Sequence, residues 1–247
     1  MQGTIVSTAG NNVGGMFGTG REATITNCSA DVNIDCVGQM VGGIIGMDAG
    51  LGVTISNCWT SGTIVSTASI VGGICGDLTA AGSSIINCYS TAAITTQYLF
   101  GGIVGRAVAG QKSNANNCNG QDPQNHIEHC IAWNALLASN NGDTGEHYSS
   151  GTVIGATAVK NYLVGCVRKA DIDFQDCPGN AAKGTDYTPF DQEDANPDTP
   201  LVKGPGTYAF AYHGKASAAG ETLSQVAQRL GWSADIWDFS GDTPKLK

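Results

Sequence analysis

Short apolar runs alternate with glycine, serine and asparagine along the first two thirds of this 247-residue chain. Three runs recur: an Ile-x-Asn-Cys run, an apolar residue six positions after the cysteine, and a Val-Gly-Gly-Ile-x-Gly run. The Asn-Cys steps Asn27-Cys28, Asn57-Cys58 and Asn87-Cys88 are 30 residues apart. A period of this size is typical of a solenoid or a propeller, but a propeller blade needs four strands and about 40 residues. Three short runs per copy therefore predict an all-β, right-handed parallel β-helix with about 29–30 residues per coil.

Alternation within each copy predicts which side chains face the interior. Cys58, Thr60 and Ile64 have the same parity in an extended segment, so they share one face. Ile55 lies three residues before Cys58, so both point inward only if the chain bends at Asn57, a residue type that tolerates the angles of a bend. The glycine pairs suit a second tight bend. Stacking then gives one column of cysteines and one of asparagines: Cys28, Cys58, Cys88, Cys130 and Cys166, with Asn27, Asn57 and Asn87.

Two less regular copies follow, with Cys130 paired to Leu136 and Cys166 paired to Ile172. Polar, glycine-rich stretches at 106–126 and 139–150 interrupt them and predict loop insertions. The repeats thus occupy residues 1–173. Residues 174–247 begin with a proline-rich stretch that excludes long strands or helices. They continue with an amphipathic helix over 221–230, which we expect to cap the open end of the β-helix with Trp232, Ile236 and Trp237 beneath it.

The Val-Gly-Gly-Ile-x-Gly and Ile-x-Asn-Cys-Trp/Tyr runs resemble the bacterial repeats known as the GLUG motif. The ending Leu230-Gly231-Trp232 through Trp237 is similar to the segment that often closes such regions. The resemblance covers residues 1–173 and 230–247. It implies a surface or secreted protein of the kind found in gut Bacteroidetes, described as an adhesin or as a repeat region attached to other domains. The resemblance assigns no catalytic residue to this sequence.

Composition and charge limit the classes of partner that this protein can bind. A net charge of −9 and a pI near 4.7 argue against binding to nucleic acid. The sequence contains no run of 18 apolar residues, so it predicts no membrane-spanning helix. The chain enters the repeat at once, so we expect a monomeric fragment of a larger extracellular or cell-surface protein. The column cysteines are expected to be buried free thiols. The sequence allows one disulfide among the remaining cysteines and does not select the pair: Cys36, Cys75, Cys118 and Cys177.

Candidate binding residues are few. Trp59 and Tyr89 follow column cysteines in adjacent coils and should stack about 4.8 Å apart on the outer surface, where they could pack on a sugar ring or lie under a loop. Trp133 follows its column cysteine by three residues rather than one, so its register along the coil differs from that of Trp59 and Tyr89. The acidic run contains four hard oxygen ligands suited to Ca²⁺, although it lacks the spacing of an EF-hand loop: Asp191, Glu193, Asp194 and Asp198. No other cofactor is indicated.

Three functions fit the sequence. The first is a non-enzymatic, adhesin-like module that binds a glycan or a host or bacterial surface protein through its loops and one flank. The second is a polysaccharide lyase or glycoside hydrolase, because such enzymes also use β-helices. Its acids would come from Asp171 and Asp173, with Asp176, Arg168 and Lys169 nearby, or from the acidic run at 191–198. The third is a structural spacer. The sequence contains no paired catalytic groups within the repeats, which favours the first.

Overall fold

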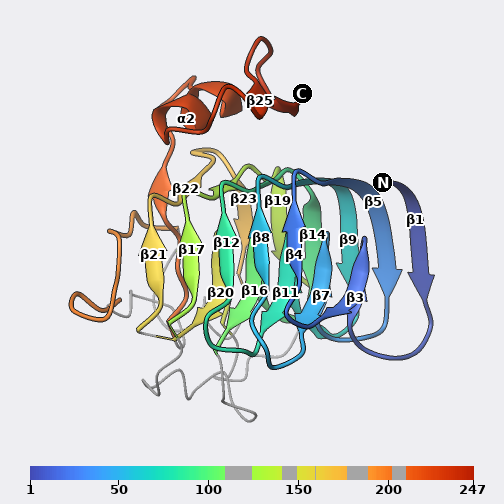
Figure 1. The fold of residues 1–247 in the computed structure, drawn as a ribbon. Helices are drawn as coiled ribbons and strands as arrows, with labels where there is room; N and C mark the ends of the chain where they lie inside the picture. The colour runs from blue at the N-terminus through green and yellow to red at the C-terminus, as the bar shows by residue number, and fades with distance from the viewer. Residues whose placement is uncertain (109–123, 141–148, 159, 177–188, 202–209) are drawn as a thin grey trace.

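The computed structural model describes residues 1–108, 124–140, 149–158, 160–176, 189–201 and 210–247. These residues form a parallel β-helix whose coils stack along one axis, with a small C-terminal unit lying against its side (Figure 1). The predicted fold class, including the single short helix described in the C-terminal part, is confirmed. Among the described residues, no helix has the length and hydrophobicity needed to cross a lipid bilayer.

Four parallel sheets run along the axis in the described part of the chain. The ten-stranded sheet contains β1 (Gln2–Ser7), β5 (Ser29–Cys36), β9 (Trp59–Ser66), β13 (Tyr89–Ser90), β14 (Ala93–Thr96), β18 (Ile131–Ala132), β19 (Leu136–Ser139), β22 (Val167–Arg168), β23 (Asp173–Gln175) and β24 (Lys215–Ala216). The four-stranded sheet contains β2 (Val13–Gly14), β6 (Val41–Gly42), β10 (Ser69–Gly72) and β15 (Tyr98–Gly101).

Two five-stranded sheets complete the coils. One contains β3 (Phe17–Gly20), β7 (Ile45–Asp48), β11 (Cys75–Leu78), β16 (Val104–Ala107) and β20 (Ile154–Thr157). The other contains β4 (Thr24–Thr26), β8 (Thr54–Ser56), β12 (Ser84–Ile86), β17 (His126–Glu128) and β21 (Tyr162–Val164). A regular coil therefore has four strands rather than the three expected, because the Val-Gly-Gly-Ile-x-Gly run is bent into two.

The interior column forms as the alternation predicts. Ile55, Cys58, Thr60 and Ile64 are all fully buried. The thiol of Cys58 donates to the carbonyl of Ser56 at 3.2 Å, and the corresponding thiols of the later coils make similar contacts. All the column cysteines are free thiols, and Cys36 and Cys75 are also free, whereas Cys118 and Cys177 lie outside the described residues.

The asparagine corner has the expected bend. Asn27, Asn57 and Asn87 have φ values of 53°, 52° and 53°, and His129 and Gly165 occupy the same position in later coils with φ of 50° and 62°. Each of the first four donates its backbone N–H to the next coil, for example Asn57 to the carbonyl of Ile86 at 3.1 Å. Asparagine suits this corner because it tolerates the left-handed region better than most residues.

The glycine pairs are needed for a reason other than the tight bend that the sequence suggested. Gly42 and Gly43 do not have left-handed backbone angles; the neighbouring left-handed corner is at Met40, and at Ile70 in the next coil. A Cβ on Gly43 would lie 2.2 Å from the carbonyl oxygen of Gly73. The pair is therefore required by close contact between coils.

The two later coils are shifted from the expected register, by one residue in the first and by two in the second. Leu137, which is fully buried, pairs with Ile94 and with Phe174 in the neighbouring coils. Leu136 is only half-buried and pairs with Asp173. The prediction that Leu136 faces the interior is wrong, because this copy has one more residue between the cysteine and the buried apolar position. Ile172 is partly buried and packs against the core, although Phe174 is the residue that pairs with Leu137.

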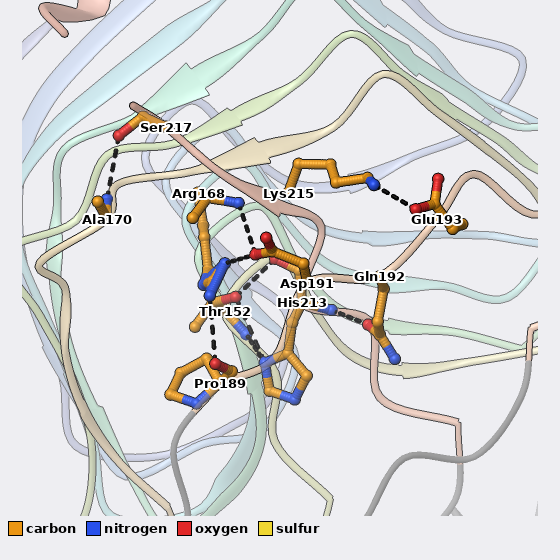
Figure 2. A network of polar contacts seen from close by, with 11 residues as sticks. Thr152, Arg168, Ala170, Pro189, Asp191, Gln192, Glu193, His213, Lys215 and Ser217 are labelled. Atoms are coloured by element: carbon orange, nitrogen blue, oxygen red, sulfur yellow. Dashed lines mark hydrogen bonds and ion pairs between the residues drawn. The ribbon is translucent and has the colours of Figure 1, made fainter. Parts of the chain in front are cut away.

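The end of the β-helix is closed by residues 189–201 and 210–217. Tyr212 makes an antiparallel bridge to Ile154, and Ala195 makes one to Leu163. Tyr212, Ala195 and Leu201 belong to the same hydrophobic core as the coils. Figure 2 shows the polar contacts that hold this cap, including Thr152 donating its N–H to Nδ1 of the fully buried His213 at 3.2 Å.

The C-terminal unit comprises residues 222–247. Its helix α2 (Leu223–Arg229) begins at Thr222, whose hydroxyl accepts from the N–H of Gln225, and ends before Gly231, which has a φ of 79°. Its hairpin pairs β25 (Trp237–Asp238) with β26 (Lys245–Leu246). The unit lies along the side of the coils (Figure 1). The expectation that this helix covers the open end is wrong, since residues 189–201 and 210–217 do so.

Candidate functional site

The outward aromatic residues of the ten-stranded sheet lie where the C-terminal unit docks. The rings of Trp59 and Tyr89 stack with centroids 5.7 Å apart and planes 4° apart, as the register of their coils requires. Trp232 and Trp237 of the C-terminal unit pack on Tyr89, with ring centroids at 6.2 and 5.8 Å. The unit therefore occupies much of the surface that was expected to be exposed.

Tyr89 is closed off from solvent. Its side chain is 2% exposed, and its hydroxyl donates to the carbonyl of Pro244 at 2.8 Å. Burial raises the pKa of this phenol well above its ordinary value. The expectation that Tyr89 offers an exposed ring to a ligand is wrong, because long-range packing covers it. Trp59, by contrast, stays half-buried at the edge of the docked unit.

A cleft of about 440 Å³ opens beside Trp59, between the coils and the hairpin of the C-terminal unit. Ser29 is the register partner of Trp59 in the preceding coil, and its small side chain leaves space on the side of the indole that faces away from Tyr89. The remaining lining is rich in hydroxyls and includes one lysine: Ser61, Thr91, Thr243, Lys245 and Leu246. We name this space the Trp59 cleft.

A second cleft, of about 420 Å³, lies at the other end of the C-terminal unit. Trp133, Lys169 and Asp171 line it on the side of the coils, and residues 217–221, which join the end cap to the C-terminal unit, complete the lining. Residues 217–221 are held to the last coil at their start, where Ser217 donates its N–H to the carbonyl of Arg168 at 2.8 Å. Lys169 forms an ion pair with Asp171 at 3.1 Å. We name this space the Trp133 cleft.

A wider and shallower hollow of about 760 Å³ lies over β12 and β17. Its lining includes Ser84, Ile86, Gln124 and His126. The imidazole of His126 is stacked on Tyr162 with ring centroids 4.3 Å apart and is paired with Glu128 at 2.6 Å.

The acidic run does not assemble into a metal site. Asp191 pairs with Arg168 at 2.9 Å, Glu193 pairs with Lys215, and Asp194 accepts the N–H of Gly165 at 2.9 Å (Figure 2 shows the first two pairs). Asp198 is exposed in a turn, where its N–H donates to Asn196. No group of three potential metal ligands occurs among the described residues. These carboxylates stabilise the end cap instead.

The candidate acids of an enzyme each contact a different partner. Asp171 is exposed beside Lys169, which lowers the pKa of this carboxyl, and Asp173 accepts a hydrogen bond from Gln175 at 3.0 Å. Asp176 contacts Ser150. Glu221 also lines the Trp133 cleft, and its bond to Arg229 lowers the pKa of this carboxyl too. A glycosidase acid needs the opposite shift, because it must be protonated before it acts.

Sequence reasoning missed several residues that line the clefts. Ser61 and Thr91 follow the outward aromatic positions by two residues, so their parity could have indicated that they face outward. Lys245 could not have been found this way, because its position depends on docking between distant segments. The predicted loops 106–126 and 139–150 fall largely outside the described residues, except that Arg106 lies in β16 and pairs with the buried Asp77.

Comparison with known proteins identifies the fold. The sequence matches no protein-family model and no curated protein. The structure is similar to the crystal structure of a protein from Bacteroides ovatus described as a putative immunoglobulin A1 protease, with a TM-score of 0.67 and 23% sequence identity. The alignment covers 99% of this chain and 67% of that chain. At this identity the likeness shows a shared fold, with the C-terminal unit included in the aligned length.

Proposed function

We propose that this chain is a non-enzymatic, adhesin-like β-helix module that binds a glycan through the Trp59 cleft. The observation that supports this best is the half-buried indole of Trp59, held flat against Tyr89 and surrounded by serine and threonine hydroxyls. A rigid aromatic face accepts the apolar face of a sugar ring, while hydroxyls exchange hydrogen bonds with the hydroxyls of the sugar. Few charges have to lose their hydration when such a neutral ring enters the cleft.

The proposal extends to the setting of the protein. The resemblance to GLUG repeats supports an extracellular or cell-surface location in a longer protein. The low content of charged residues, 13%, and the net charge of −9 do not favour nucleic acid. The structural neighbour is described as acting on immunoglobulin A1, so this host glycoprotein belongs among the test ligands.

Native affinity electrophoresis tests the proposal. The protein is run through gels containing xylan, hydroxyethylcellulose, laminarin, polygalacturonate, gastric mucin or immunoglobulin A1, and the gels are then stained for polymer. We expect retarded migration in at least one gel with no cleared zone, and loss of retardation in Trp59→Ala. Phe17→Ala removes an exposed ring at another place and serves as the matched control.

Other outcomes would contradict the proposal. Retardation that is unchanged in Trp59→Ala would place the binding elsewhere. A cleared zone, or fragments of immunoglobulin A1, would favour an enzyme and would make Asp171 and Asp173 the first residues to replace. Migration unaffected by every polymer would favour the structural spacer. Thermal unfolding of each variant distinguishes a lost contact from a lost fold.

A further inference from the structure

Two parallel rows of side chains cross the coils on the outer face of the ten-stranded sheet, and the second row connects the two clefts. The first row consists of Trp59, Tyr89, Ile131 and Val167, which are register partners in successive coils. Two residues after each of them lies a half-buried residue beside the C-terminal unit, the first within β9 and the others directly after β13, β18 and β22. We call this second row the outer row: Ser61, Thr91, Trp133 and Lys169.

Backbone hydrogen bonds fix the order of the outer row. The N–H of Thr91 donates to the carbonyl of Thr60 at 2.9 Å, and that of Trp133 donates to Ser90 at 2.9 Å. The N–H of Lys169 donates to the carbonyl of Ala132 at 2.8 Å. Adjacent members of the row are therefore neighbours in successive coils, about 4.8 Å apart.

The row joins the two indoles into one surface. Ser61 and Thr91 line the Trp59 cleft, and Trp133 and Lys169 line the Trp133 cleft. From Trp59 to Trp133 the path crosses two strand spacings and advances two residues along the strand, which amounts to about 12 Å. A single sugar ring cannot contact both indoles across this distance, but an extended chain of several rings can.

We infer that the outer row is a binding track for one extended polysaccharide chain, with Trp133 as a second sugar platform. This inference rests on the proposed function, because it assumes that Trp59 binds a sugar. The ion pair of Lys169 and Asp171 at the far end offers both hydrogen-bond donors and acceptors to hydroxyl groups. The track selects chain length, since binding at both platforms makes the second contact intramolecular.

Isothermal titration calorimetry with the polymer that retards the protein, together with its own disaccharide and long oligosaccharides, tests the inference. We expect affinity to rise with chain length by about tenfold or more once both platforms are spanned. Trp133→Ala should reduce the affinity for long chains by a similar factor and leave disaccharide binding unchanged. Trp133→Phe, which keeps a ring, should restore much of the loss.

The outcomes separate the inference from the proposed function. If Trp59→Ala abolishes binding but Trp133→Ala leaves every chain length unaffected, the track is wrong and the Trp59 cleft stands. If none of the polymers binds, both fail.

Trp133 also contacts the C-terminal unit, so its replacement could disturb packing. Thr91→Val removes the hydroxyl between the platforms, which also donates to the carbonyl of Thr60 at 3.3 Å. Thr63→Val, on the exposed face, removes a hydroxyl that donates to Asn33 at 2.9 Å and is the matched control. The two variants should lose similar, small amounts of thermal stability, but only Thr91→Val should weaken long-chain binding.

Discussion

The rings of Trp59 and Tyr89 are parallel to within 4° and 5.7 Å apart, yet the two residues have different surroundings. Tyr89 is 2% exposed beneath the C-terminal unit, whereas Trp59 lies at the edge of that unit beside a cleft. The same stacking thus serves two purposes, because Tyr89 anchors residues 222–247 and supports the indole that faces the cleft.

Trp232→Ala should release the C-terminal unit from the coils. The indole is 4% exposed, packs on Trp237 with ring centroids 4.9 Å apart, and donates its N–H to the carbonyl of His129 at 3.0 Å. Removing such a side chain costs about 3–5 kcal/mol. We expect protease to cleave between residues 217 and 247 in the variant while the coils stay intact, as followed by mass spectrometry.

Tyr89→Phe gives a graded version of the same test. It keeps the ring and removes only the hydroxyl that donates to Pro244, so the docking energy should fall by about 1 kcal/mol. Cleavage should then be intermediate between the wild type and Trp232→Ala. Equal resistance in all three proteins would show that the unit is not held by this aromatic cluster.

Asn57→Ala should destabilise the β-helix through the backbone. Asn57 has a φ of 52°, and an alanine there meets the cost of the left-handed region, about 1–2 kcal/mol. Asn57→Gly should cost much less, because glycine adopts these angles freely and Gly165 already occupies the equivalent corner of a later coil. Urea unfolding of both variants measures the difference. Equal losses in the two would attribute the effect to the side chain instead.

Much of the fold could be predicted because the repeat imposes the same local demands in every coil. The parity of Cys58, Thr60 and Ile64 and the bend at Asn57 follow from alternation alone, and the structure confirms them. The reason for Gly43 could not be predicted in the same way. Its need for close approach depends on the carbonyl of Gly73, 30 residues later, and not on its own backbone angles.

The candidate site was harder to predict because it depends on contacts between distant segments. The stacking of Trp59 and Tyr89 follows from their register, but the cover over Tyr89 comes from residues more than 140 positions later in the chain, such as Trp232 and Trp237. The shift from Leu136 to Leu137 was hidden for a similar reason, because both are leucines and only pairing with Ile94 distinguishes them.

Gly43→Ala should be among the most damaging single changes. The new Cβ would lie 2.2 Å from the carbonyl oxygen of Gly73 and 2.6 Å from Cγ2 of Thr60, and the first of these is backbone that cannot move without separating two coils. The expected cost is at least about 3 kcal/mol, at the upper end for overpacking. Gly241→Ala, whose Cβ would meet nothing closer than 3.9 Å, is the matched control. Urea midpoints that coincide for the two variants would contradict the account.

The stability of the protein should fall in mild acid because of His213 in the end cap. Burial, together with the nearby charge of Arg168, lowers the pKa of this imidazole from 6.5 to about 3. Nδ1 accepts the N–H of Thr152, which also requires the neutral ring. Below about pH 6.5 the unfolded chain takes up a proton that the folded protein refuses, so the free energy of unfolding decreases as the pH falls from 6.5 towards 3.

The size of this effect can be measured by urea unfolding at pH 7 and pH 5. A full pH unit corresponds to about 1.4 kcal/mol, so the 1.5 units between 6.5 and 5 give a loss of about 2 kcal/mol. His213→Asn should lower stability at pH 7 but remove this loss. Carboxylates such as Asp171 and Glu221 have lowered pKa values, so their contribution appears at lower pH. Burial raises the pKa of Asp77, which acts in the opposite sense, and the comparison of the wild type with His213→Asn cancels this contribution because Asp77 is present in both proteins. A wild-type protein equally stable at both pH values would show that His213 is reached by protons in the folded state, and that the cap over the last coil opens readily.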